Sequence, residues 1–334
     1  KLSNLNKRKQ TKRKKEKNRA SGICGTITKY LIFIGIILFS AKGMSQQDPV
    51  FTQYMYNMSV VNPAYATDDP GILNLGGIYR AQWVNVDGAP RTANFFAHTP
   101  ISERIELGLT VVNDEVGDWV KENNITADFA YVLPISQNSK LSFGAKAGVT
   151  TFDSNTNGIN LNHPIDAAFE NYSEAFPVFG VGAFWFSDNY YLGVSAPNLF
   201  TATHLENSQG IQGIGEEEIH YYITGGYVFD LSQNVKLKPA FMARGVQDSP
   251  LSVDVTANVL LYNRLEAGLG YRFDESVTGL VNFKITPQLR VGYAYDYTTT
   301  NFGNYNDGTH EIMVLFDIDL FGLNKGYDKS PRFF

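Results

Sequence analysis

The feature that most constrains this chain is an alternation of apolar and polar residues along segments of about ten residues or more. Between residues 140 and 152 the odd positions are mainly apolar, whereas the even positions up to 150 are small or polar. The same pattern recurs in 251–261 and 265–273. A period of two over this length indicates β-strands with one apolar and one polar face.

About fourteen such segments can be delimited in the chain. They lie near 72–84, 91–99, 105–113, 122–133, 140–152, 176–187, 190–197, 219–229, 235–244, 251–261, 265–273, 276–285, 289–298 and 309–320. Strands of soluble sandwiches usually have about 5–6 residues, whereas a tilted strand needs roughly ten to cross a bilayer. The sequence therefore predicts an all-β protein, an outer-membrane antiparallel β-barrel of about 14 strands. A large soluble β-protein with the apolar faces in its core is the alternative.

The connections between these segments provide an independent test, because bacterial barrels alternate short periplasmic turns with longer outer loops. Every second connection is short, and the four longest connections all fall in the other set: 114–121, 153–175, 198–218 and 299–308. An even number of strands returns both ends of the barrel to the periplasm. The connections thus favour the membrane barrel and place 153–175 and 198–218 outside the cell.

The N-terminal 45 residues differ from the rest. They hold 12 of the 28 Lys and Arg residues and one acid, Glu16, and they end in an apolar run at 30–41 followed by small residues. This order is typical of a secretory signal peptide, and the run is shorter than the roughly 20 residues of a spanning helix. A retained membrane anchor is the alternative. We predict cleavage before Gln46, which also removes the single cysteine, Cys24.

The predicted organisation has four parts. Residues 1–45 form a signal peptide with an extended basic region, 46–70 a short periplasmic or lumenal N-terminal arm, 71–320 the transmembrane barrel, and 321–334 a C-terminal periplasmic tail. The chain after residue 45 keeps 16 basic and 32 acidic residues, a formal charge of −16. Because this part of the chain is strongly acidic, we do not expect it to bind nucleic acid.

The sequence offers no clear catalytic or cofactor motif. The five histidines include no pair at i and i+4, and there is no nucleophile elbow, phosphate-binding loop or dinucleotide fingerprint. The segment 153–158 matches the first half of a calcium loop, but its twelfth position is Pro164 where a bidentate Glu is needed. We therefore predict no enzymatic activity, no cofactor and no metal site.

Residues 46–65, QQDPVFTQYMYNMSVVNPAY, lack alternation and mix aromatic with polar side chains. Further landmarks follow in order: YRAQW at 79–83, GAPRT at 88–92, GVSAPN at 193–198, HEI at 310–312 and SPRFF at 330–334. These segments and their order resemble the PorP/SprF family of type IX secretion system membrane proteins.

The resemblance implies an outer-membrane barrel of a Bacteroidetes-type bacterium that works with the type IX secretion machinery. Some members are associated with the periplasmic ring of the machine, and others support export or surface anchoring of one large surface protein, often a gliding adhesin. The expected partners are this machinery, a secreted surface protein and the lipid bilayer. The family carries no catalytic residue onto this sequence.

The partner-binding candidates are residues of the arm and of the first predicted strand: Gln53, Tyr54, Tyr56, Asn57, Asn62 and Pro63, with Arg80 and Trp83. Each also has a purely structural interpretation. Arg80 could neutralise lumen acids, Trp83 could lie in the aromatic girdle, and the arm could be an inert plug. The main functional alternative is an outer-membrane pore for small solutes, lined by charges such as Lys146 and Arg272, and an outer-membrane enzyme is a third.

Overall fold

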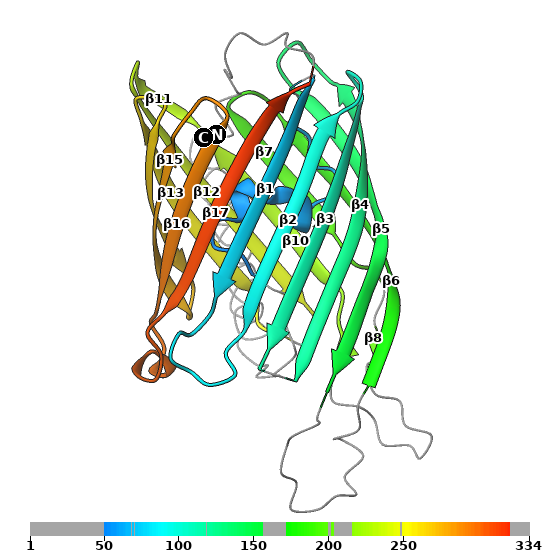
Figure 1. Cartoon of the computed structure of the whole chain (residues 1–334). Helices are drawn as coiled ribbons and strands as arrows, with labels where there is room; N and C mark the ends of the chain where they lie inside the picture. The colour runs from blue at the N-terminus through cyan, green and yellow to red at the C-terminus, as the bar shows by residue number, and fades with distance from the viewer. Residues whose placement is uncertain are drawn as a thin grey trace, which may run out of the picture. The chain divides into compact units, whose positions relative to one another are not determined.

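The computed structural model describes residues 50–320 except 68, 70, 118, 156–171, 200–201, 204–215 and 248. The predicted signal peptide (1–45) and C-terminal tail (321–334) lie outside the described residues, as does most of the segment that resembles a calcium loop. The described residues form a closed antiparallel barrel of 14 strands (Figure 1). Sequential strands pair as neighbours, β1 pairs with β17, and the barrel closes between β10 and β12.

The barrel strands are β1 (Ile72–Ala81), β2 (Arg91–Pro100), β3 (Ile105–Val116), β4 (Val120–Pro134), β5 (Lys140–Ser154), β6 (Tyr172–Phe186), β7 (Tyr190–Ala196), β10 (His220–Tyr227), β12 (Val235–Val246), β13 (Ser252–Leu261), β14 (Leu265–Arg272), β15 (Ser276–Lys284), β16 (Leu289–Thr298) and β17 (Thr309–Asp319). The short strand β11 (Phe229–Ser232) continues β10 along β12. A separate two-stranded pair joins β8 (Ala202–Thr203) to β9 (Glu216–Glu217). The predicted fold class and strand number are confirmed.

The two rims of the barrel differ in their connections (Figure 1). The turn end carries short turns such as 101–104 and 262–264, whereas the loop end carries longer connections such as 82–90 and 299–308. One expected long loop, 114–121, is wrong: β3 and β4 run on until only 117–119 separates them. Alternation of polarity fades in this stretch because both strands become polar, so the pattern did not show that pairing continues.

The two faces of the barrel wall have opposite chemistry, as the alternation predicts. Apolar side chains on the outer face are about half exposed, the state expected of groups that meet lipid. Examples are Phe95, Ile125, Phe143, Val181, Ile223, Val281 and Ile312. The inner face is polar and buried, with Thr92, Asn94, Glu106, Asp128, Lys146, Glu266, Asp296 and Glu311 among its residues.

The N-terminal arm lies inside the barrel (Figure 1). It contains a 3₁₀ turn, η1 (Tyr54–Tyr56), and one helical turn, α2 (Met58–Val61); a second 3₁₀ turn, η3 (Asn301–Asn304), lies between β16 and β17. Among the described residues no helix has the length and apolar character needed to cross a membrane. The main hydrophobic cluster of the protein consists of arm residues packed on inward-facing wall residues, among them Phe51, Met55, Met58, Phe96, Phe184, Tyr191 and Met313. We call residues 50–67 the plug.

Candidate functional site: the plugged lumen

The start of the plug is held by an ion cluster on β1, β16 and β17. The Arg80 guanidinium lies 3.0 Å from the Asp296 carboxylate and 3.2 Å from that of Glu311. The backbone N–H groups of Thr52 and Gln53 each donate to Glu311 at 2.8 Å, and the Thr52 hydroxyl donates to Asp296 at 2.6 Å. Arg80 thus neutralises two lumen acids that also bind the plug.

The aromatic turn η1 is anchored on the next part of the wall. The Tyr56 hydroxyl donates to Glu266, which also accepts a bond from the Asn258 amide at 2.7 Å. Burial raises the pKa of Tyr56 well above its ordinary value, so the hydroxyl keeps the proton that it donates. The Lys238 Nζ and the Arg290 guanidinium carbon lie 5.2 and 5.4 Å from the Tyr56 ring centroid, within the range of cation–π contact.

The helical turn α2 is held on the opposite wall through its free carbonyl groups. The Lys146 ammonium donates to the carbonyls of Ser59 at 2.9 Å and Val60 at 3.2 Å, and it lies 3.6 Å from Asp128. The Ser195 hydroxyl donates to the next carbonyl, that of residue 61, at 2.6 Å. Carbonyl groups at a helix C-terminus carry partial negative charge, which a buried ammonium stabilises.

After α2 the plug passes over glycines whose missing side chains make room for it. A Cβ atom at Gly144 would lie 2.3 Å from the carbonyl of Pro63, and one at Gly182 would lie 2.2 Å from the side-chain oxygen of Asn62. The Asn62 amide donates to the carbonyl of Ala183 at 3.2 Å. Gly144 therefore makes room for the plug backbone, and Gly182 makes room for the Asn62 side chain.

The end of the plug is fixed near the turn end. The backbone N–H of Thr67 donates to Glu106 at 2.6 Å, and His98 Nδ1 lies 2.9 Å from the same carboxylate. The Tyr65 ring packs against His98 with 5.4 Å between ring centroids. The plug is thus attached along its whole length, to strands on all sides of the barrel.

The structure brings seven of the eight candidate residues together in the lumen. Gln53, Tyr54, Tyr56, Asn57, Asn62 and Pro63 are buried in the plug, and Arg80 is 2% exposed. Trp83 was expected on the first strand, but β1 ends at Ala81 and Trp83 lies in the following connection with φ of 42°. Its ring packs edge-on against Phe302 at 5.0 Å between centroids.

Sequence reasoning missed which wall residues hold the plug. Glu266, Asp296 and Lys146 were recognisable as lumen charges from the alternation, but their partners lie far away in the sequence. Glu311 stands in the HEI segment, and nothing local marked it as the acceptor for two plug amides. The sequence shows only a glycine at position 144, which does not indicate that the plug contacts it.

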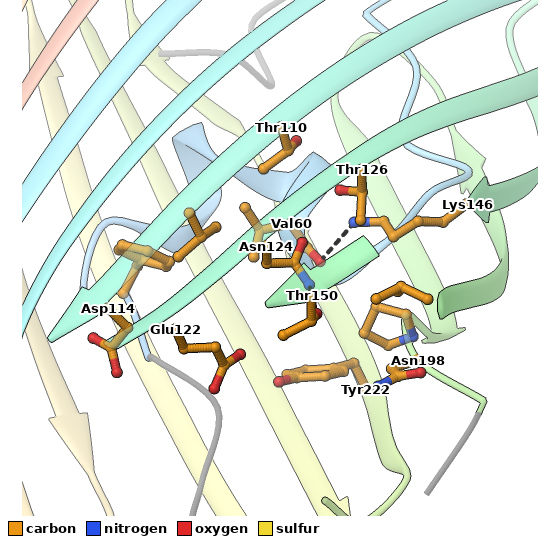
Figure 2. Close-up of a pocket in the computed structure, with 14 residues that line it drawn as sticks. Val60, Thr110, Asp114, Glu122, Asn124, Thr126, Lys146, Thr150, Asn198 and Tyr222 are labelled. Atoms are coloured by element: carbon orange, nitrogen blue, oxygen red, sulfur yellow. Dashed lines mark hydrogen bonds between the residues drawn. The ribbon is translucent and has the colours of Figure 1, made fainter. Parts of the chain in front are cut away.

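Cavities lie beside the plug on both sides. The first lies on the loop-end side, encloses about 720 Å³ that includes open solvent, and is bounded by Phe51 and Val60 of the plug (Figure 2). The second encloses about 530 Å³ on the other side and is bounded by Met55, Tyr56 and Tyr65 together with wall residues that include Asp317. Over the described part of the chain, no group of three His, Cys, Asp or Glu side chains is placed to hold a metal ion.

Comparison with solved structures finds other outer-membrane barrels. A FadL homologue of Pseudomonas aeruginosa is 13% identical, with a TM-score of 0.48 over 84% of this chain and 96% of that chain. The monoaromatic hydrocarbon channel CymD is 11% identical, with a TM-score of 0.46 over 82% and 94%. Omp33 of Acinetobacter baumannii is 10% identical, with a TM-score of 0.44 over 74% and 96%. No curated protein sequence matches the chain.

Comparison with protein-family models gives a more specific result than comparison with solved structures. The model of the type IX secretion system membrane protein family PorP/SprF matches residues 43–316, which include the plug and nearly the whole barrel. The landmarks of the arm and of β1, β7 and β17 fall within this range. The chain belongs to the PorP/SprF family of type IX secretion system membrane proteins.

Proposed function

We propose that this barrel is a docking platform of the type IX secretion system in the outer membrane, which supports export or surface anchoring of a large secreted protein, with a gliding adhesin as one candidate. The family supports the secretion system, and the plugged lumen supports docking. A barrel filled by its own N-terminal arm, held by Arg80, Tyr56 and Lys146, offers no free passage for a polypeptide. We infer no catalytic role for it.

In this proposal the two rims of the barrel have different partners. The loop end faces the cell surface and holds the secreted protein, whereas the turn end faces the periplasm and meets the machinery. Export of the barrel itself would use residues 1–45 as a cleaved signal. The plug residues proposed from the sequence, such as Gln53 and Asn62, then act indirectly. They hold the plug in the lumen between the two rims.

The experiment compares surface and secreted proteomes of a strain that lacks this gene with those of the complemented strain. We expect loss of one or a few large surface proteins, with the other secreted proteins unchanged, for a dedicated accessory. Failure of all type IX cargo would instead place the barrel in the core machine. An unchanged proteome would contradict the secretion role and leave the solute pore as the better hypothesis.

A further inference from the structure

We propose that the loop-end connections 82–90 and 299–308 form a binding site for the neutral sugars of a glycolipid in the outer leaflet of the membrane. This inference goes beyond the docking role, although it rests on the proposed orientation in which the loop end faces the cell surface. The first connection joins β1 to β2, the second joins β16 to β17, and the two lie side by side (Figure 1). We call this surface the rim site.

Backbone hydrogen bonds join the two connections into one unit. The N–H of Val84 donates to the carbonyl of Gly308 at 2.9 Å, and the N–H of Asp307 donates to the carbonyl of Val84 at 2.9 Å. The N–H of Trp83 donates to the hydroxyl of Thr309 at 3.2 Å. The side chains of the two connections are therefore held at fixed positions relative to each other.

Trp83 has a backbone conformation that bulky side chains rarely adopt, with φ of 42°. Asn85 has φ of 70°, but Asn is one of the few residues that tolerate this region. Residues in such conformations persist only where surrounding contacts impose them, and they are concentrated at functional sites. Here the Trp83 ring is held edge-on against Phe302. The conformation therefore favours a binding role for the ring over lipid packing alone.

The rim site combines aromatic rings with amide and carboxylate groups. Phe302 is 38% exposed and Tyr305 is 75% exposed. The same connections expose Asn85, Asp87, Asn301, Asn304 and Asp307. Aromatic faces stack on the C–H faces of sugar rings, while amides and carboxylates form hydrogen bonds with sugar hydroxyls. Neither connection contains Lys or Arg, and the next basic residue, Arg91, starts β2 opposite Glu115. The site therefore fits neutral sugars better than phosphate.

The lipid-facing wall below the rim site carries a stripe of tyrosines on β16. Tyr293, Tyr295 and Tyr297 lie at alternate positions of its outer face and lead to the 299–308 connection. The Tyr295 hydroxyl donates to the carbonyl of Asp307 at 3.0 Å, which ties the stripe to the rim site. Tyrosines in such positions mark the boundary between hydrocarbon and head groups. A lipid whose acyl chains pack on this wall therefore brings its head group to the rim site, which favours a glycolipid over the glycan of a soluble protein.

The test uses the full chain in nanodiscs, which expose both rims, with calorimetric titration of polysaccharide released by mild acid from the lipopolysaccharide of the source strain. We expect saturable binding. Trp83→Asn suits the left-handed backbone but removes the ring, and it should weaken binding by at least about fivefold, as should Phe302→Ala with Tyr305→Ala. The control Trp185→Ala with Tyr190→Ala removes an aromatic pair with centroids 5.1 Å apart beside the turn 187–189, and it should bind as the parent does.

Absence of binding, unchanged affinity in both rim variants, or an equal loss in the turn-end control would overturn the inference. Binding only of glycans released from secreted surface proteins would also overturn it, because the sugar would then belong to a protein. Maleimide labelling of Asn304→Cys in intact cells tests the orientation: we expect labelling, and protection until the cells are opened would place the loop end in the periplasm. A chain that binds no polysaccharide but whose deletion removes a surface protein would keep the proposed function and lose the glycolipid site.

Discussion

A chain that lacks residues 50–67 should conduct ions through its barrel, whereas the chain that keeps them should not. Eight strands suffice for an interior that wall side chains can fill, and fourteen enclose a wider lumen. Here the plug supplies the material that fills it, including Phe51, Met55 and Met58. Its removal leaves a wide lumen whose inner wall is mainly polar and admits water. Planar-bilayer recordings should show open-channel currents for the deletion and a closed baseline for the parent.

Controls for this deletion distinguish an opened lumen from a damaged barrel. Replacement of 50–67 by a Gly/Ser linker of equal length keeps the chain length but removes every anchor, and it should also conduct. Both variants should keep the heat-dependent electrophoretic shift of a folded barrel. A folded deletion variant that stays closed would contradict the assignment of the plug. A parent chain that conducts in the same assay would favour the solute-pore alternative.

Substitution of Arg80 by methionine should destabilise the folded barrel by about 3–5 kcal/mol, because it removes the guanidinium that pairs with two buried carboxylates. Asp296 and Glu311 are both nearly inaccessible to solvent and both also bind the plug, so the barrel wall and the plug are weakened together. Urea titration of the barrel in lipid vesicles, followed by tryptophan fluorescence, measures the change in the free energy of unfolding.

The matched control for Arg80→Met is Lys121→Met. Lys121 pairs with Glu115 at 2.9 Å, but their side chains are 55% and 36% exposed, so the loss should be at most about 1 kcal/mol. Adding Glu311→Gln to Arg80→Met should restore part of the stability, since it removes one of the two charges that lose Arg80 as a partner. Equal effects of Arg80→Met and Lys121→Met would show that the buried cluster does not hold the plug.

The barrel could be predicted because alternation is a local property of the sequence. Segments such as 140–152 and 265–273 show their two faces without knowledge of any partner strand, and strand length then separates a membrane wall from a soluble sandwich. The prediction was wrong where both faces turn polar. Between Asp114 and Glu122 the strands continue to pair, but no apolar face marks them.

The plug could be recognised only as a segment that lacks alternation. Its position in the lumen depends on pairs that are distant in the sequence: Thr52 with Asp296 is separated by 244 residues, and Tyr56 with Glu266 by 210. The amino-acid composition does not indicate which wall residue each plug residue contacts. The wall glycines illustrate the same limit, since Gly182 looks like any strand glycine until Asn62 is placed against it.

The most direct test of the plug is a disulfide between Asn62→Cys and Gly182→Cys. A Cβ atom at Gly182 would lie 3.2 Å from Asn62 Cγ, so the two Cβ atoms fall near the roughly 3.5–4.5 Å that a disulfide requires. The only native cysteine is Cys24 in the predicted signal. Gly279→Cys provides the control partner for Asn62→Cys, because Gly279 lies on the wall strand β15 and an added Cβ there meets nothing within 4 Å.

In oxidised outer membranes, non-reducing electrophoresis of heat-unfolded protein should show a cross-linked species for the 62/182 pair and none for the 62/279 pair. A folded 62/182 barrel whose two cysteines both react with maleimide but never cross-link would place the arm outside the lumen, and the account of a plugged docking platform would fail.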